Sequence, residues 1–194
     1  MDISTITDAF SDVTIQSPTV GVMLAGLLAI ALVFISAFAS GSEIAFFSLS
    51  PTDVAELEED KTSSDRKIQM LREDSERTLA TILITNNFVN VMIVMLLSNI
   101  FVSIVKFGPK AYWLEFLIMT VFLTFLLLLF GEIMPKVYSR QAPLRFCRRS
   151  VDAILFFRKI FWPIESILLK SRMLTEKVMK KENHVLSVDE LEQA

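Results

Sequence analysis

Three long apolar runs, separated by polar segments, dominate the chain. They cover about residues 20–47, 78–105 and 112–134. A transmembrane α-helix needs about 20 predominantly apolar residues to cross the hydrocarbon core of a bilayer, and each run is that long. The pattern therefore predicts an all-α integral membrane protein with three transmembrane helices, a multi-pass protein of the cell membrane.

Two further segments are expected to form amphipathic helices outside the spans. Residues 50–77 mix acidic and basic side chains with a few apolar positions, which is typical of short helices lying against a membrane or a neighbouring domain. Residues 143–170 are rich in arginine and paired aromatics, but Asp152 and the Trp162-Pro163 step make them a poor fourth span. We expect an interfacial helix, with its apolar face in the membrane and its arginines toward acidic lipid head groups.

The distribution of lysine and arginine predicts the topology. Residues 1–19 contain neither, whereas residues 50–77 and the region after the third span contain many. Because short cytoplasmic segments carry the excess of basic residues, we expect the amino terminus outside and the carboxyl terminus inside. Residues 1–19 would then be extracytoplasmic, residues 20–170 the membrane domain, and residues 171–194 a cytoplasmic linker toward a soluble region.

Composition excludes several classes of function. The net charge of −3 gives little support for a nucleic-acid partner. The single cysteine, Cys147, and the single histidine, His184, allow no disulfide and no thiolate or imidazole cluster. A bound metal would therefore be a hard cation held by oxygen. The spans hold no histidine or lysine that could activate a serine, and no His-Glu-x-x-His motif occurs, so we do not expect an enzyme.

Each apolar run nevertheless carries polar side chains. They form two aligned pairs and one carboxylate: Ser36 and Ser40 in the first run, Asn86 and Asn90 in the second, and Glu132 near the end of the third. A buried amide without a partner costs a few kcal/mol, and an intramembrane carboxylate is rare, so these groups must face protein, water or an ion. Helix packing and interhelical hydrogen bonding are the alternative explanation, which suits Asn87 better because it points about 100° away from the pair.

The predicted topology places all three polar stretches in the inner half of the membrane. Hydroxyl, carboxamide and carboxylate oxygens together suit Mg²⁺, Na⁺ or Ca²⁺, and the one negative charge offsets part of the desolvation of the cation. Pro135 has no backbone N–H, so the carbonyl of Gly131, four residues earlier, loses its helical partner and could also bind the ion. Glu43, three residues beyond Ser40, and Asn87 are weaker candidate ligands.

These polar stretches lie in motifs that resemble a known family. The motifs are Ser40-Gly-Ser-Glu-Ile-Ala-Phe-Phe-Ser48, Asn86-Asn87-Phe-Val-Asn90 and Phe130-Gly-Glu-Ile-Met-Pro-Lys136. In this order they resemble the signature stretches of the transmembrane module of the CorC/CorB and cyclin M (CNNM) magnesium transporters. The resemblance extends from the first span to the interfacial helix.

The resemblance implies a homodimer of three-span subunits with a belt of juxtamembrane helices. It also implies a dehydrated Mg²⁺ held within the membrane by five residues: Ser36, Ser40, Asn86, Asn90 and Glu132. Export of Mg²⁺ coupled to Na⁺ would proceed by alternating access, with Gly41, Gly131 and Pro135 as hinges. Family members usually continue into a pair of nucleotide-binding CBS domains, which this sequence does not contain. The alternative function is a non-transporting membrane anchor or scaffold for cytosolic regulatory domains.

Overall fold

The computed structural model describes residues 13–59, 62–108 and 111–166. Its elements are, in order, β1 (Thr14–Ile15), α2 (Val20–Phe47), α3 (Pro51–Glu59), α4 (Ser63–Glu73), α5 (Ser75–Ile104), β2 (Val105–Lys106), α6 (Tyr112–Leu126), the π-helix η1 (Leu127–Ile133) and α7 (Met134–Gln141). Residues 143–166 form a further helix, which we call the lateral helix. The prediction of an all-α protein is confirmed apart from the two short strands.

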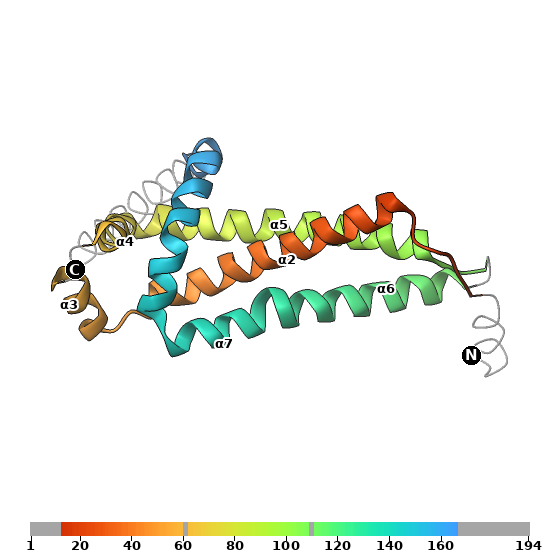
Figure 1. Ribbon diagram of the computed structural model, residues 1–194, viewed down its shortest axis with the longest axis horizontal. Helices are drawn as coiled ribbons and strands as arrows, with labels where there is room; N and C mark the ends of the chain where they lie inside the picture. Colours follow the sequence, from red (N-terminus) through yellow and green to blue (C-terminus); the bar gives the residue numbers. More distant parts are fainter. Residues whose placement is uncertain (1–12, 60–61, 109–110, 167–194) are drawn as a thin grey trace, which may run out of the picture.

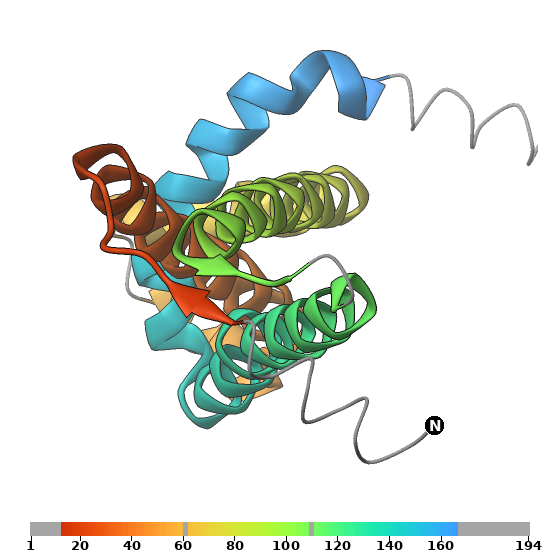
Figure 2. The ribbon, with the colours of Figure 1, turned by 90° about the vertical axis from the view of Figure 1, so that its right-hand side faces the viewer.

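The long helices lie side by side along the longest axis of the molecule (Figure 1). They are α2, α5 and the continuous rod α6–η1–α7, and within the described residues these three are long and apolar enough to cross a membrane. The helices α3 and α4 lie at one end, and the lateral helix crosses the bundle near that end and leaves it sideways (Figure 2). At the other end β1 pairs antiparallel with β2.

The observed helices are longer than two of the predicted spans. The predicted span 20–47 coincides with α2, whereas α5 begins at Ser75 rather than at residue 78. The third rod continues to Gln141 instead of ending at residue 134. An apolar run predicts only the part of a helix that can lie in lipid. It does not predict polar turns at the beginning or end of the same helix. Pro135 falls in the first turn of α7, where a helix tolerates proline.

A compact apolar core lies where α3, α4 and the lateral helix meet the ends of α2 and α5. Leu57, Ile68 and Leu71 have almost no exposed surface and pack against Cys147 and Val151 of the lateral helix. Burial raises the pKa of the Cys147 thiol to about 12, so this cysteine is a protonated core residue. The lateral helix is thus anchored along one face by packing.

The opposite face of the lateral helix becomes apolar toward its end. Phe156, Ile160, Trp162 and Ile164 are exposed there. Exposed large apolar side chains on a helix beside membrane spans are typical of an interfacial helix. The depth of this helix in a bilayer, like the predicted topology and the segment boundaries, stays a prediction, and its predicted last residues, 167–170, lie outside the described residues.

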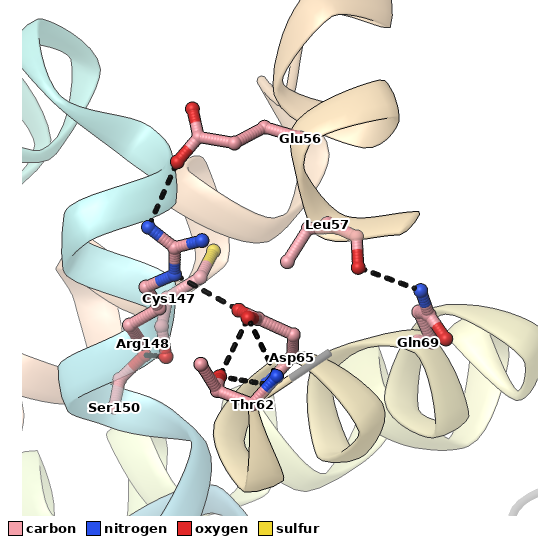
Figure 3. A network of polar contacts seen from close by, with 8 residues as sticks. All are labelled: Glu56, Leu57, Thr62, Asp65, Gln69, Cys147, Arg148 and Ser150. Atoms are coloured by element: carbon pink, nitrogen blue, oxygen red, sulfur yellow. Dashed lines mark hydrogen bonds and ion pairs between the residues drawn. The ribbon is translucent and has the colours of Figure 1, made fainter. Parts of the chain in front are cut away.

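A buried polar network fixes the lateral helix to α4 (Figure 3). The carboxylate of Asp65 is fully buried, accepts a hydrogen bond from Arg148 Nε at 2.9 Å, and takes part in a capping box with Thr62 at the start of α4. Arg148 Nη1 also bonds Glu56 at 2.9 Å. Burial by itself would raise the pKa of Asp65, but the hydrogen bonds from Arg148 and Thr62 outweigh it and hold the pKa below its usual value. The predicted amphipathic segment 50–77 therefore contains a buried carboxylate that joins it to the lateral helix.

Candidate cation site between the three long helices

Oxygen atoms from α2 and α5 converge in the middle of the bundle. The hydroxyl of Ser36, which is fully buried, lies 3.0 Å from Asn86 Oδ1 and 2.5 Å from Asn90 Oδ1. One hydroxyl proton serves two acceptors here, because Ser36 is the donor in both contacts. The predicted pairs on the two helices therefore meet through Ser36, Asn86 and Asn90.

The third helix reaches the same cluster at Gly131. A Cβ atom built on Gly131 would lie 3.2 Å from Ser36 Oγ and 4.0 Å from Asn90 Oδ1. This glycine therefore lets the backbone of η1 approach the oxygen cluster, and a side chain at this position would crowd Ser36. Side chains of α2 and α5 and the backbone of η1 thus lie next to one another, and the binding of an ion there stays a prediction.

The backbone of η1 departs from α-helical geometry next to this approach. The N–H of Met134 donates to the carbonyl of Leu129, five residues earlier, which is the hydrogen-bond pattern of a π-helix. In that register, the carbonyl that Pro135 leaves without a donor is that of Phe130, whereas an α-helical register would leave that of Gly131. The predicted role of the Gly131 carbonyl as an extra ligand stays a prediction. π-helical turns are frequently found at functional sites.

Ser40 lies one turn beyond Ser36 on α2, and its hydroxyl is fully buried. Its Oγ has no hydrogen-bond partner among the described residues. A buried hydroxyl without a partner carries an energetic penalty of about 1–3 kcal/mol, unless a water molecule or an ion satisfies it. Ser40 is therefore a fitting ligand for an ion or its bound water, although the structure does not join it to the Ser36 cluster by a hydrogen bond.

The two carboxylates proposed as ligands differ in their surroundings. Glu132 follows Gly131 in η1 and is half-buried, and no hydrogen bond or ion pair joins it to another described residue. Glu43, in contrast, pairs with Lys136 of α7, with 3.1 Å between Oε2 and Nζ. Within the described residues no hydrogen bond joins Glu132 to the Ser36 cluster, so its predicted role as a ligand stays a prediction. Glu43 and Lys136 instead join α2 to α7.

Two other predicted residues, Asn87 and Gly41, lie outside the Ser36 cluster. Asn87 is exposed on α5 and does not contact the cluster, in line with its predicted direction. At Gly41 an added Cβ would lie 2.6 Å from the ring of Phe146. Gly41 therefore permits close packing of the lateral helix on α2, and its predicted role as a hinge stays a prediction.

The chemistry of the cluster suits a hard cation that binds and leaves. Among residues 13–59, 62–108 and 111–166, no three carboxylate, histidine or cysteine side chains gather as a metal site. The available donors are hydroxyl, amide and carboxylate oxygens. Around Mg²⁺, with oxygens at about 2.0–2.1 Å in an octahedron, neighbouring ligands lie about 2.9 Å apart. Ser36 Oγ lies 3.0 Å from Asn86 Oδ1 but 2.5 Å from Asn90 Oδ1, so the three oxygens form a hydrogen-bonded cluster and not an octahedral ligand shell.

Sequence reasoning missed a second polar contact on α5. Thr81 donates a hydrogen bond of 2.6 Å to Glu165 of the lateral helix, and Glu165 is fully buried. One turn further along, Thr85 donates to the carbonyl of Thr81 at 2.7 Å. The only sequence signal was the spacing of two threonines four residues apart, which is common in helices.

The fold and the oxygen cluster define a multi-pass membrane protein with a polar site between its helices. Comparison with known families identifies this class further. Residues 27–194 match the model of the cyclin M transmembrane N-terminal domain. The chain belongs to this CNNM family, which confirms the resemblance found in the sequence motifs. Membership also agrees with the predictions of a membrane location and of a protein that is not an enzyme.

Individual relatives support the same family. Over 172 residues the chain is 32% identical to a UPF0053 protein of Mycoplasma genitalium, which covers 84% of this chain and 39% of that protein. It is 31% identical over 172 residues to "Metal transporter cnnm-4" of Caenorhabditis elegans. This match covers 81% of this chain and 35% of that protein. A UPF0053 protein of Haemophilus influenzae is 30% identical over 161 residues, and this match covers 81% of this chain and 37% of that protein. The chain thus spans well under half the length of these relatives.

Proposed function

We propose that this chain is the membrane domain of a divalent cation transporter, with Mg²⁺ as the transported ion. Five residues would hold the ion in the membrane: Ser36, Ser40, Asn86, Asn90 and Glu132. The observation that carries the proposal is the convergence of Ser36, Asn86 and Asn90 oxygens next to Gly131. The name of the Caenorhabditis elegans relative, a metal transporter, supports the same function.

The hydrogen bonds within the cluster suggest how an ion would bind. The Ser36 hydroxyl links the two asparagine oxygens. A cation entering the cluster would turn these oxygens toward itself, and each protein oxygen would replace a water molecule of the hydrated ion. Glu132 would supply negative charge, which lowers the cost of removing the ion from water. Amide and hydroxyl ligands carry no charge, so binding stays weak enough for release.

Transport requires the site to open to each side of the membrane in turn. We propose that η1 is where the third rod yields, because Gly131 carries no side chain and Pro135 cannot continue the hydrogen-bond ladder. Coupling of Mg²⁺ export to Na⁺ entry would use the same oxygen ligands, since both are hard cations. A CBS-pair region downstream would regulate the movement.

We further propose that two copies of the chain form a homodimer in the membrane. Asn87 is exposed on α5 in the apolar part of the helix, beside the exposed side chains of Leu83 and Val91. A carboxamide exposed to hydrocarbon lacks hydrogen-bond partners, and small or amide side chains commonly join helices across membrane interfaces. Burial of this face against a second copy would satisfy Asn87.

The competing function is a membrane anchor without transport. In that case, the hydrogen bonds between Ser36, Asn86 and Asn90 would serve only to hold α2 against α5. Interhelical hydrogen bonds of this kind contribute about 0.6 kcal/mol on average in membranes. The two functions therefore differ in ion binding rather than in fold.

Ion flux into proteoliposomes tests the proposal. We expect Asn90→Ala to reduce Mg²⁺ flux at least about 100-fold, because it removes a ligand oxygen from the dehydrated ion. Asn99→Ala is the matched control, since Asn99 is an exposed asparagine further along the same helix, and it should leave the flux unchanged. Repeating the measurement with an opposing Na⁺ gradient tests the coupling ion.

Two results would reject transport by this site. Equal Mg²⁺ flux through Asn90→Ala and the unsubstituted protein would show that the cluster does not carry the ion. Absence of Mg²⁺ binding by the unsubstituted chain in isothermal titration, with α2 and α5 still packed, would favour the anchor. Circular dichroism during heating separates both results from simple loss of the fold.

A further inference from the structure

Glu165 is a fully buried carboxyl group that the cation site does not use. It lies near the end of the lateral helix, where it faces the first turns of α5. Its Oε1 accepts a hydrogen bond of 2.6 Å from Thr81 Oγ1. Its Oε2 is buried and has no hydrogen-bond partner among the described residues. An ionised carboxylate in this position would carry half of its charge on an oxygen without a donor.

The charged groups facing Glu165 pair with another acid. Arg158, on the lateral helix, bonds Asp74 through Nη2, and Arg77 Nε lies 3.8 Å from the same carboxylate oxygen. Arg158 Nη1 and Arg77 Nε have no hydrogen-bond acceptor among the described residues, so neither donates to Glu165. Asp74 offsets part of the positive charge of both arginines. Among the described residues, no positively charged side chain therefore pairs with Glu165 alone.

The hydroxyl of Thr81 lies within hydrogen-bond distance of two acceptors but has only one proton to donate. Thr81 Oγ1 lies 2.6 Å from Glu165 Oε1 and 2.8 Å from the carbonyl oxygen of Arg77. Both distances are those of good hydrogen bonds, but the hydroxyl has only one proton to donate. A protonated Glu165 completes both bonds, because its O–H donates to Thr81 while Thr81 donates to the Arg77 carbonyl.

The electrostatic surroundings of Glu165 also favour its protonated form. Burial raises the pKa of the Glu165 carboxyl, and the negative charge of Asp74 raises it further. The hydrogen bond from Thr81 and the charges of Arg158 and Arg77 lower it, but burial is the larger effect, and the net pKa lies above the ordinary value of a glutamic acid.

We propose that Glu165 and Thr81 form a proton-binding site that holds the lateral helix against α5 when the proton is bound. Loss of the proton would leave a buried, poorly compensated carboxylate, which favours separation of the end of the lateral helix from α5 so that water can reach Glu165. The proton transfers between Glu165 and water, and no other group needs to change its protonation.

The position of this site gives the proton a mechanical role. The end of the lateral helix also packs on α5 through an edge-to-face contact of Phe161 with Phe88. On the α5 side, the Thr81 carbonyl accepts a hydrogen bond from Thr85, which directly precedes Asn86. Docking of the lateral helix is therefore linked along α5 to the segment that carries the cation ligands.

Infrared spectroscopy tests the proton site directly, in the full chain in lipid nanodiscs without Mg²⁺. We expect a protonated-carboxyl band that persists well above the pH at which free glutamic acid ionises, about 4.3. This band should vanish in Glu165→Gln and remain in Asp152→Asn, which removes an exposed carboxylate from the same helix. A band absent from the unsubstituted protein, or unchanged in Glu165→Gln, would overturn the proposal.

Stability against pH provides a second test that needs no spectroscopic assignment. A carboxyl group with a raised pKa in the folded state stabilises the fold at low pH relative to high pH, so stability is lost as the pH rises through the folded pKa. We expect the unfolding constant to increase more between pH 5 and pH 8 in the unsubstituted protein than in Glu165→Gln, which has no carboxyl group to titrate at this position. Hydrogen exchange should locate the change in the lateral helix.

Either of two results in this second test would contradict a bound proton. If Glu165→Gln were as dependent on pH as the unsubstituted protein, Glu165 would not titrate in this range. If Glu165→Gln failed to fold at every pH, a neutral side chain at this position would not hold the lateral helix against α5, contrary to the proposal. Both measurements are made without an ion gradient, so they do not depend on the proposed transport.

Discussion

The two ends of the helical bundle are built in different ways. At the end that carries α3, α4 and the lateral helix, Ile68, Leu71 and Val151 have no exposed surface, and a buried ion pair ties the helices together. Toward the other end an open apolar groove of about 530 Å³ separates the long helices, and its lining includes Gly26, Phe34 and other residues of α2, α5, α6 and η1. The oxygen cluster of Ser36, Asn86 and Asn90 lies between these two regions.

The difference follows from the two solvents. Where water surrounds the helices, burial of apolar surface drives them together and produces a tight core. In lipid, apolar side chains gain little by leaving hydrocarbon for protein, so only close packing and polar contacts hold helices in place. The two ends of the bundle therefore differ in packing: one has a tight apolar core, and the other has a groove between its helices.

The largest predicted effect is the loss of the buried ion pair in the packed end. Arg148→Ala leaves the fully buried Asp65 without its principal donor, and we expect the free energy of unfolding to fall by about 3 kcal/mol. Arg149→Ala, which removes the exposed neighbouring arginine, should change it by less than about 0.5 kcal/mol. Thermal unfolding in detergent measures both effects. If the two substitutions had equal effects, the ion pair of Arg148 with Asp65 would not stabilise the packed end.

A pair of glycine substitutions compares the cation cluster with the groove. Gly131→Ala places a methyl group 3.2 Å from Ser36 Oγ, and we expect about a tenfold loss of Mg²⁺ affinity, equivalent to roughly 1.4 kcal/mol. Gly26→Ala meets no atom within 4 Å and should bind Mg²⁺ normally, with a small gain in stability from helix propensity. Isothermal titration gives the affinities. An unaffected Gly131→Ala would mean that the cluster is loosely packed like the groove.

Acid should loosen the packed end before the spans. The pKa of Asp65 is lowered in the folded protein, so its contribution to stability is present above about 3.9, its ordinary value, and is lost as the pH falls through the folded pKa. Hydrogen exchange at decreasing pH should therefore increase first in α4. Asp65→Asn should remove this dependence on pH, and a first increase within α5 instead would contradict the expected order.

The smallest effect concerns the ion pair between α2 and α7. Glu43 and Lys136 are each about a quarter to a third exposed, at 26% and 33%, so solvent screens their attraction. A double-mutant cycle with Glu43→Gln and Lys136→Met should yield a coupling energy of about 0.5 kcal/mol that declines with added salt. Insensitivity to salt would indicate that this pair is as shielded as that of Asp65 and Arg148.

Sequence patterns could predict the spans and part of the site. Apolar length marks a membrane helix, and four-residue spacing puts Asn86 and Asn90 on one face, so their meeting with Ser36 could be anticipated. The direction of Asn87 also follows from helical geometry. These features depend only on local periodicity.

Other features depend on contacts between distant segments. The π-helical register of η1, the ion pair of Glu43 with Lys136 and the burial of Asp65 each need a neighbour that no spacing reveals. Gly41 illustrates the limit, because its sequence context suggested a hinge, whereas its close approach to Phe146 depends on where the lateral helix docks. The burial of Glu165 could likewise not be predicted, because its sequence surroundings are those of an ordinary amphipathic helix.

The π-helical turn of η1 has a consequence at the level of the gene. Such a turn amounts to one residue inserted into an α-helix. The wider turn accommodates this extra residue, so deletion of a single codon in η1, such as that of Leu128, would let the rod return to α-helical winding while the residues beyond it keep nearly the same face. The same deletion in the α-helical part of α6 would turn everything beyond it by about 100°. Gly131 would then move away from Ser36 and Lys136 from Glu43, so a deletion in η1 should disturb the site less than a deletion in α6.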